Sequence, residues 1–91
     1  DPATGEFAGY DIAVQTRQSL TNIQNILASE GLTMANVVKT TVLLKNISDF
    51  GAMNEVYATF FENDCPARAA FEVAALPKAA LVEIEAIAYA E

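Results

Sequence analysis

The apolar residues of this chain alternate between helical and strand spacing, and the order of these segments limits the folds that it can adopt. Residues 11–30 carry a helical stripe of apolar residues. Asp11, the first residue of this range, can cap the first turn, and Gly31, which follows the range, suits the left-handed position after a helix. The stripe consists of Val14, Leu20, Ile23, Ile26 and Leu27. Polar residues, Gln15 among them, are expected mostly on the opposite side. The segment therefore predicts an amphipathic helix.

Residues 37–44 read Val-Val-Lys-Thr-Thr-Val-Leu-Leu, a β-branched and apolar run that favours a strand. Alternation divides this run into a mainly apolar face and a more polar face with Lys39 and Thr41. The apolar face consists of Val38, Thr40, Val42 and Leu44. We expect it to pack on helices, with the other face against less apolar surroundings.

A second helix is predicted over residues 48–61, where Ser48 and Asp49 offer a start and Asn63-Asp64-Cys65-Pro66 breaks the pattern. Its helically spaced apolar residues are Phe50, Met53, Val56, Tyr57 and Phe60. Strands are predicted over residues 67–74 and 81–89, with a turn at Leu76-Pro77-Lys78 between them.

The predicted order is thus helix, strand, helix, strand and strand, in one domain that spans residues 1–91. Residues 1–10, with Pro2 and Gly5, read as a turn. A helix that crosses between parallel strands needs a strand before it to close the sheet. Because the first predicted element is a helix, we expect the chain to lack N-terminal strands of a complete α/β sandwich.

The charge of the chain disfavours a nucleic-acid ligand. Its formal net charge is −7, and the five basic residues are scattered along the sequence. Proteins that bind nucleic acids instead concentrate lysine and arginine on one face. The 91 residues also make a small core, which association between copies would help to stabilise.

Missing residue types exclude several kinds of site. Cys65 is the only cysteine and the chain has no histidine, which removes an internal disulfide, a His/Cys metal site and the commonest general base. No apolar run reaches the roughly 18 residues that span a bilayer. We therefore expect a soluble, cytoplasmic protein without a metal or other cofactor.

Arg68 is the basic residue most suited to a binding role. It follows Pro66 at the start of a predicted strand. A guanidinium is planar, always charged and able to hold a carboxylate through two parallel hydrogen bonds. A small carboxylic acid is therefore one candidate ligand, and a surface or interface salt bridge is the alternative reading.

Several blocks of the sequence resemble the RidA/YjgF family, also called L-PSP. Pro66-Ala67-Arg68, Leu76-Pro77-Lys78 and the run over residues 82–88 resemble its C-terminal signature. Further blocks match in the same order at residues 1–6, 15–20, 37–42, 49–50, 54–57 and 60–61. The resemblance implies a chorismate-mutase-like α/β sandwich, in which two helices pack on one face of a mixed sheet. It also implies a homotrimer with ligand sites between subunits, and N-terminal strands, which we expect this chain to lack.

The resemblance implies an enzyme that deaminates enamines and imines, such as 2-aminoacrylate and 2-iminobutanoate, to 2-keto acids and ammonia without a cofactor. Arg68 would hold the substrate carboxylate and Glu83 would hold the attacking water. A trimeric sensor that binds small carboxylic acids without turnover is the alternative. A ribonuclease or translation inhibitor ranks third, because the chain is acidic and lacks histidine.

The same resemblance implies further site residues. Asn54 and Tyr57 would lie at the rim of the cleft, although Tyr57 equally fits the core stripe of its helix. Ala69 and Ala70 follow the arginine, and the backbone of Ala70 would donate to the carboxylate. Alternation in the last strand places Glu83 on the face opposite Val82, Ile84, Ala86 and Ala88, together with Glu85, which is expected to be structural. The alternative for both carboxylates is a solvated or salt-bridged face, with Lys39 or Arg68 as the partner.

Departures from the family pattern also stand out. The family often has a cysteine where this chain has Ala70, and an arginine where it has Ala75. Its preceding segment, moreover, supplies further pocket residues.

Overall fold

The computed structural model describes residues 11–61 and 65–89, and these form two helices and a mixed three-stranded sheet. The helices are α1 (Ile12–Ser29) and α2 (Phe50–Phe60). The strands are β1 (Val37–Leu44), β2 (Ala67–Glu72) and β3 (Val82–Ala88). The order of elements agrees with the sequence prediction. The turns predicted within residues 1–10 and at residues 63–64 lie outside the described part.

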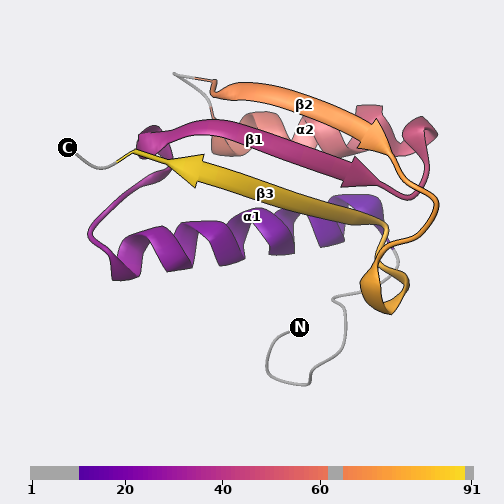
Figure 1. Cartoon of the computed structure of the whole chain (residues 1–91), viewed down its shortest axis with the longest axis horizontal. Coiled ribbons are helices and arrows are strands. Elements are labelled where there is room, and N and C mark those ends of the chain that lie inside the picture. Colours follow the sequence, from indigo (N-terminus) through magenta and orange to yellow (C-terminus); the bar gives the residue numbers. More distant parts are fainter. Residues whose placement is uncertain (1–10, 62–64, 90–91) are drawn as a thin grey trace.

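β1 is the central strand, parallel to β2 and antiparallel to β3. Both helices lie on one side of the sheet, with α2 behind β1 and β2 and α1 along β3 (Figure 1). This arrangement is the predicted sandwich of two helices on a mixed sheet. Short 3-10 turns precede β1, α2 and β3 at Met34–Asn36, Ile47–Asp49 and Pro77–Ala79.

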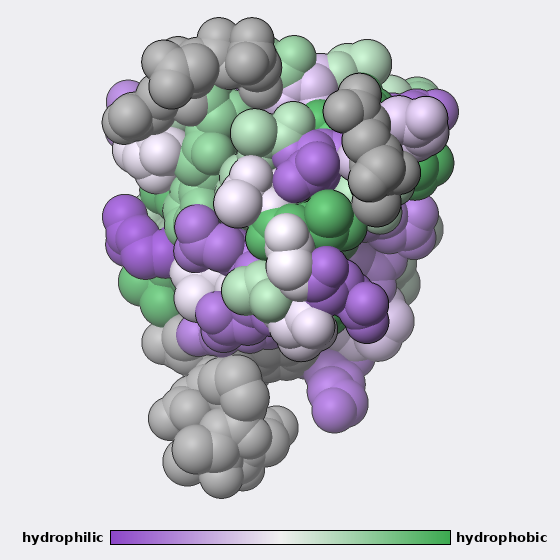
Figure 2. Space-filling model, turned by 90° about the vertical axis from the view of Figure 1, so that its left-hand side faces the viewer, coloured by the Kyte–Doolittle hydropathy of each residue, from purple (hydrophilic) through white to green (hydrophobic). Residues whose placement is uncertain are grey.

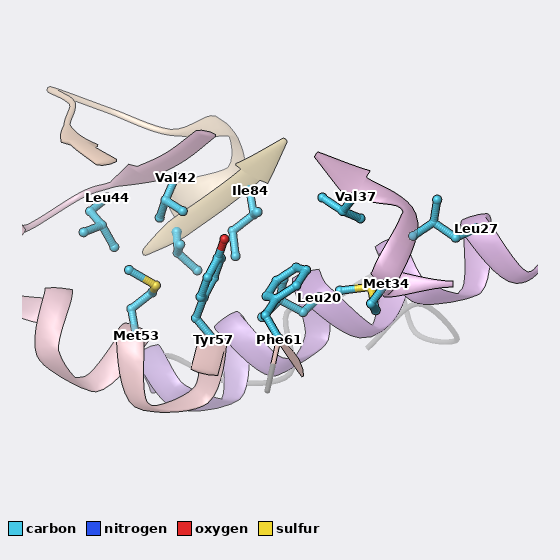
Figure 3. Packing of buried hydrophobic residues seen from close by; sticks show 11 residues of the cluster. Leu20, Leu27, Met34, Val37, Val42, Leu44, Met53, Tyr57, Phe61 and Ile84 are labelled. Carbon is cyan, nitrogen blue, oxygen red and sulfur yellow. The ribbon is translucent and has the colours of Figure 1, made fainter. Parts of the chain in front are cut away.

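The core lies between the helices and the inner face of the sheet (Figure 3). Leu20 of α1, Met53 of α2 and Val42 and Leu44 of β1 are fully buried there. The other buried apolar residues of this cluster are Leu27, Met34, Val37, Tyr57, Phe61, Val82 and Ile84. Because alternate strand residues point to opposite faces, one row from each strand meets the helices and the other row remains open.

The two helices begin differently. The carboxylate of Asp11 accepts hydrogen bonds from the amides of Ala13 and Val14, at 2.8 and 3.1 Å, so the predicted cap of α1 is confirmed. Asp49 precedes α2 but makes no such bond, and the 3-10 turn leads directly into this helix instead. Gly31 lies just beyond the end of α1 and has a φ of +72°, as expected of the left-handed residue after a helix.

Two predictions about α1 are wrong. Ile26 was expected in the buried stripe but is 67% exposed, because Leu27 beside it occupies the contact with the core. Gln15 was expected on the polar side but is buried, and its Oε1 accepts a hydrogen bond of 2.8 Å from the amide of Leu81. A polar residue therefore faces the sheet where α1 meets the start of β3.

The predicted alternation in β1 fails at its first residues. Val38 was expected on the buried face, but it is 50% exposed whereas Val37 is buried. The pairing with β3 shifts between Val37 and Lys39, so an extra residue is accommodated there as in a β-bulge. From Thr40 to Leu44 the predicted alternation is confirmed.

Charged and apolar residues share the surface of the molecule. Hydrophobic and hydrophilic side chains are interspersed over the end where β1 begins and β3 ends (Figure 2). No helix among the described residues is long and apolar enough to cross a membrane.

Candidate functional site

Arg68 lies on the helix-facing side of β2, next to α2. It pairs in register with Thr40, whose side chain is buried beneath the helices, so both residues belong to the same face of the sheet. Its Cζ atom lies 4.8 Å from the ring centroid of Tyr57 and 5.1 Å from that of Phe50. Nη1 donates a hydrogen bond to Oδ1 of Asn54. Three side chains of α2 therefore hold one arginine.

These contacts fix the guanidinium without neutralising it. The two rings attract the cation through their π-electrons, and the Asn54 oxygen is an uncharged acceptor. A guanidinium has five N–H donors, and no other described residue accepts from Arg68. The side chain is exposed, so its remaining donors can reach a planar anion such as a carboxylate.

The backbone of β2 adds a donor beside Arg68. The amide of Val73 donates to the carbonyl of Leu44 at 2.9 Å, so Ala69 and Phe71, at alternate positions, also direct their amides to β1. Arg68 and Ala70 direct theirs to the outer edge, with which no described strand pairs. The Ala70 amide is thus placed where it can donate to a ligand, whereas the Ala69 amide belongs to the sheet.

The far end of β2 is tied to the loop before α2. Nζ of Lys45 donates to the carbonyl of Ala74 at 2.6 Å, and the amide of Ile47 donates to Oε1 of Glu72 at 2.8 Å. These bonds link an edge strand that has one described neighbour to the segment that leads into α2. They help to keep Arg68 in register with the residues that hold it.

Asn54 and Tyr57 come together with Arg68, but they occupy different depths. Asn54 is half-buried and bonds to the guanidinium. Tyr57 is only 4% exposed, and its Oη lies 2.7 Å from Oγ1 of Thr40. Its ring also packs on Phe61, with centroids 4.7 Å apart. Tyr57 is therefore a core residue beneath Arg68, which agrees with the alternative reading from its helical spacing.

Glu83 lies on the other face of the sheet. It pairs with Leu43, which alternates with the inward-facing Val42 and Leu44, and Glu85 follows on the same open face. The predicted placement of both carboxylates is therefore confirmed. Glu83 is on β3 and Arg68 is on β2, two strand spacings apart, or roughly 10 Å across the sheet. One copy of the chain does not bring these two side chains together.

Two residues of the site were not singled out from the sequence. Phe50 lies four residues before Asn54 on α2, so helical spacing alone could have placed them on a common face. Thr40 is a polar residue on the otherwise apolar face of its strand, and this departure from the apolar pattern could have marked it in the sequence. Neither signal points to Arg68, because the contact depends on where β2 packs.

The described residues offer no metal centre. They contain no group of three or more His, Cys, Asp or Glu side chains that could hold a metal ion. Cys65 is exposed, and its thiol donates to the carbonyl of Phe61 at 3.3 Å.

The chain matches a family model described as endoribonuclease L-PSP over residues 1–90. It is 51% identical over 88 residues to the 2-iminobutanoate/2-iminopropanoate deaminase of Rattus norvegicus, covering 97% of this chain and 64% of that protein. It is 55% identical to a RutC family protein of Pyrococcus horikoshii, covering 100% and 72% respectively. The chain thus spans less than two thirds of the length of the rat protein.

Solved structures share the same architecture. The E. coli YjgF gene product superposes with a TM-score of 0.90 at 46% identity, covering 97% of this chain and 71% of that one. E. coli TdcF with bound serine superposes with a TM-score of 0.93 at 40% identity, covering 99% and 72%. Both the fold and the order of its elements are therefore those of these proteins.

Proposed function

This chain belongs to the endoribonuclease L-PSP family, which includes RidA/YjgF proteins, and we propose that it hydrolyses enamines and imines of small carboxylic acids. The expected substrates are 2-iminobutanoate and 2-aminoacrylate, and the products are 2-keto acids and ammonia. The names of the mammalian relatives support this reaction class. We also propose a cytoplasmic location, where reducing conditions keep the exposed Cys65 as a thiol.

The observation that carries this proposal is the arrangement around Arg68. Phe50, Tyr57 and Asn54 of α2 hold the guanidinium of the exposed Arg68. Two residues further along β2, the Ala70 amide is directed to the outer edge of that strand, with which no described strand pairs. A carboxylate accepts hydrogen bonds from both kinds of donor, and charge-assisted bonds to arginine are among the stronger ones in proteins. Because the chain has a net charge of −7, a small anion needs a local positive charge to bind, and the exposed guanidinium of Arg68 supplies one.

The reaction itself needs positioning and one water molecule. An enamine such as 2-aminoacrylate first takes a proton from solvent at its CH2 carbon, which gives a protonated C=N bond. Water adds to the carbon of the protonated C=N bond, the water loses a proton, and a carbinolamine forms. Its nitrogen is then protonated, and the C–N bond breaks as the hydroxyl loses its proton, so that ammonia leaves and the C=O bond of the keto acid forms. A protonated imine is already electrophilic, so holding the substrate and water in place supplies much of the acceleration. Glu83 accepts the proton from the water in this proposal.

Arg68 and Glu83 can serve one substrate only if two copies of the chain form the site. They lie on opposite faces of the sheet within one copy. We therefore propose that the open face of one copy approaches the Arg68 edge of another in a homotrimer. Exposed Phe71 and Ile87 on the open face support such an interface.

A second candidate is a binding protein that senses small carboxylic acids. Arg68 and its supports are complete within one copy, whereas Glu83 is not part of that cluster. The structure of the relative TdcF with bound serine supports a carboxylate ligand without implying turnover. A ribonuclease is disfavoured by the absence of histidine and the excess of acidic residues.

The test is hydrolysis of 2-iminobutanoate, generated in place by a threonine dehydratase and followed by trapping with semicarbazide. We expect Arg68→Ala to lower kcat/KM about 100-fold, since a charged hydrogen-bonding group is removed. Arg17→Ala, which removes an exposed arginine from α1, is the matched control and should leave the rate unchanged.

Three outcomes are informative. If Arg68→Ala loses the acceleration and Arg17→Ala keeps it, the deaminase is supported. Binding of 2-ketobutanoate by the parent chain without any acceleration supports the sensor. Absence of both binding and acceleration contradicts both proposals for the 91-residue chain.

A further inference from the structure

Thr40 is an exception on the buried face of β1. It is 1% exposed, and the residues that follow it on the same face are Val42 and Leu44. A valine has nearly the same shape and favours strands as strongly, so folding alone does not require a hydroxyl here. A buried hydrogen-bonded pair contributes little more to stability than two apolar groups of the same shape. The hydroxyl therefore calls for another explanation.

The partner of Thr40 is the residue against which Arg68 lies. Oγ1 of Thr40 and Oη of Tyr57 are 2.7 Å apart, and Figure 3 shows Tyr57 rising from α2 with its hydroxyl directed at the sheet. Thr40 is also the register partner of Arg68 on the neighbouring strand. One hydrogen bond thus joins the strand position beside Arg68 to the ring that contacts its guanidinium.

This bond limits how the ring can move. Phe61 packs on the Tyr57 ring, and Thr40 bonds to its hydroxyl. A ring held by both contacts presents a constant surface to Arg68, whose long side chain otherwise samples many rotamers. Ligand affinity rises when such a side chain is ordered before binding, because less freedom is lost in the complex.

We propose that Thr40 and Tyr57 are positioning residues, which hold Arg68 in the orientation that receives the carboxylate of the substrate. They touch neither the carboxylate nor the reacting carbon. This inference rests on the proposed function of Arg68, and it adds a buried hydroxyl pair that controls affinity from within the core.

The test uses the double variant Thr40→Val/Tyr57→Phe, which removes both hydroxyls and leaves no buried polar atom unpaired. We expect its Kd for 2-ketobutanoate, and its KM for 2-iminobutanoate, to rise about threefold to tenfold, the range that ordering one mobile side chain accounts for. The unfolding midpoint and kcat should change little. Thr16→Val is the matched control, because Thr16 is a fully buried threonine of α1 that bonds to the carbonyl of Ile12.

A rescue experiment separates positioning from packing. Thr40→Ser keeps the hydroxyl and loses a methyl group, so it should bind 2-ketobutanoate within about twofold of the parent while unfolding more easily. Thr40→Val keeps the volume and loses the hydroxyl, so it should bind more weakly. If affinity instead follows packing, with serine weaker than valine, Thr40 is structural and the inference is overturned.

The inference and the proposed function fail in different ways. If Arg68→Ala abolishes binding of 2-ketobutanoate while the double variant binds like the parent, only the positioning role is wrong. If Arg68→Ala binds like the parent, the carboxylate site is wrong and the positioning role falls with it.

Discussion

The two faces of the sheet are made from the same three strands but have opposite characters. The inner face places Val42, Leu44, Val82 and Ile84 against the helices, where they are buried. The open face carries charged side chains and exposed apolar ones, among them Glu83, Glu85, Phe71 and Ile87. A face with both kinds of residue suits contact with another surface better than contact with water alone.

The comparison also separates two parts of the candidate chemistry. Arg68 belongs to the inner face and depends on residues of α2 for its position. Glu83 belongs to the open face. The group that we propose to bind the carboxylate of the substrate is therefore held in place within one copy, whereas the proposed base on the open face meets it only if a second copy approaches.

The largest expected effect compares adjacent leucines of β1. Leu44 is fully buried on the inner face, and Leu44→Ala should cost about 2–5 kcal/mol through lost burial and a cavity. Leu43 lies on the open face and is half-buried, so Leu43→Ala should cost less than about 1 kcal/mol in the isolated copy. Urea unfolding followed by circular dichroism measures both. Equal costs would mean that the two faces are not distinct.

The next effect concerns the two carboxylates of the open face. Glu83→Gln should lower kcat for 2-iminobutanoate about 100-fold, because a general base is lost while the amide keeps its size. Glu85→Gln, two residues along the same strand, is the control and should keep kcat within about threefold of the parent. A fall of the same size in both variants would indicate a loss of overall negative charge rather than a specific base.

A smaller effect tests whether the open face is an interface. Ile87→Asp should weaken association of copies about tenfold, because it places a charge on an exposed apolar residue of that face. Its neighbour across the strands is Lys39, so the fold should tolerate the change. Ile26→Asp alters an equally exposed isoleucine of α1 and should leave the mass unchanged. Light scattering across a concentration series measures the mass of the assembly. If neither variant lowers that mass, the result argues against the interface.

Much of the fold was predictable because local spacing determines it. The helical stripe of α1, the β-branched run of β1 and the alternation in β3 each indicated their elements correctly. Val38 was misplaced because a bulge depends on how the neighbouring strand pairs, which the alternation of one strand does not reveal. Gln15 was misplaced for a similar reason, since its partner, the amide of Leu81, lies far along the chain.

The candidate site was predictable only in part. Arg68 stands out in the sequence because basic residues are few, and Asn54 and Tyr57 followed from the family resemblance. The contact between Arg68 and the rings of Phe50 and Tyr57 depends on the packing of β2 beside α2. Alternation placed Glu83 on the open face, but only the strand order shows how far it lies from Arg68.

The most direct test of the central claim, that Arg68 and the Ala70 amide bind a small carboxylate, is a nitrogen-15 NMR titration of the chain with 2-ketobutanoate. We predict saturable shifts of the Arg68 Nε–H and Ala70 amide signals, while the side-chain signal of Arg17 stays in place. The account would be contradicted by shifts confined to other residues. It would also be contradicted by the absence of any shift at 2-ketobutanoate concentrations that saturate carboxylate sites of other proteins.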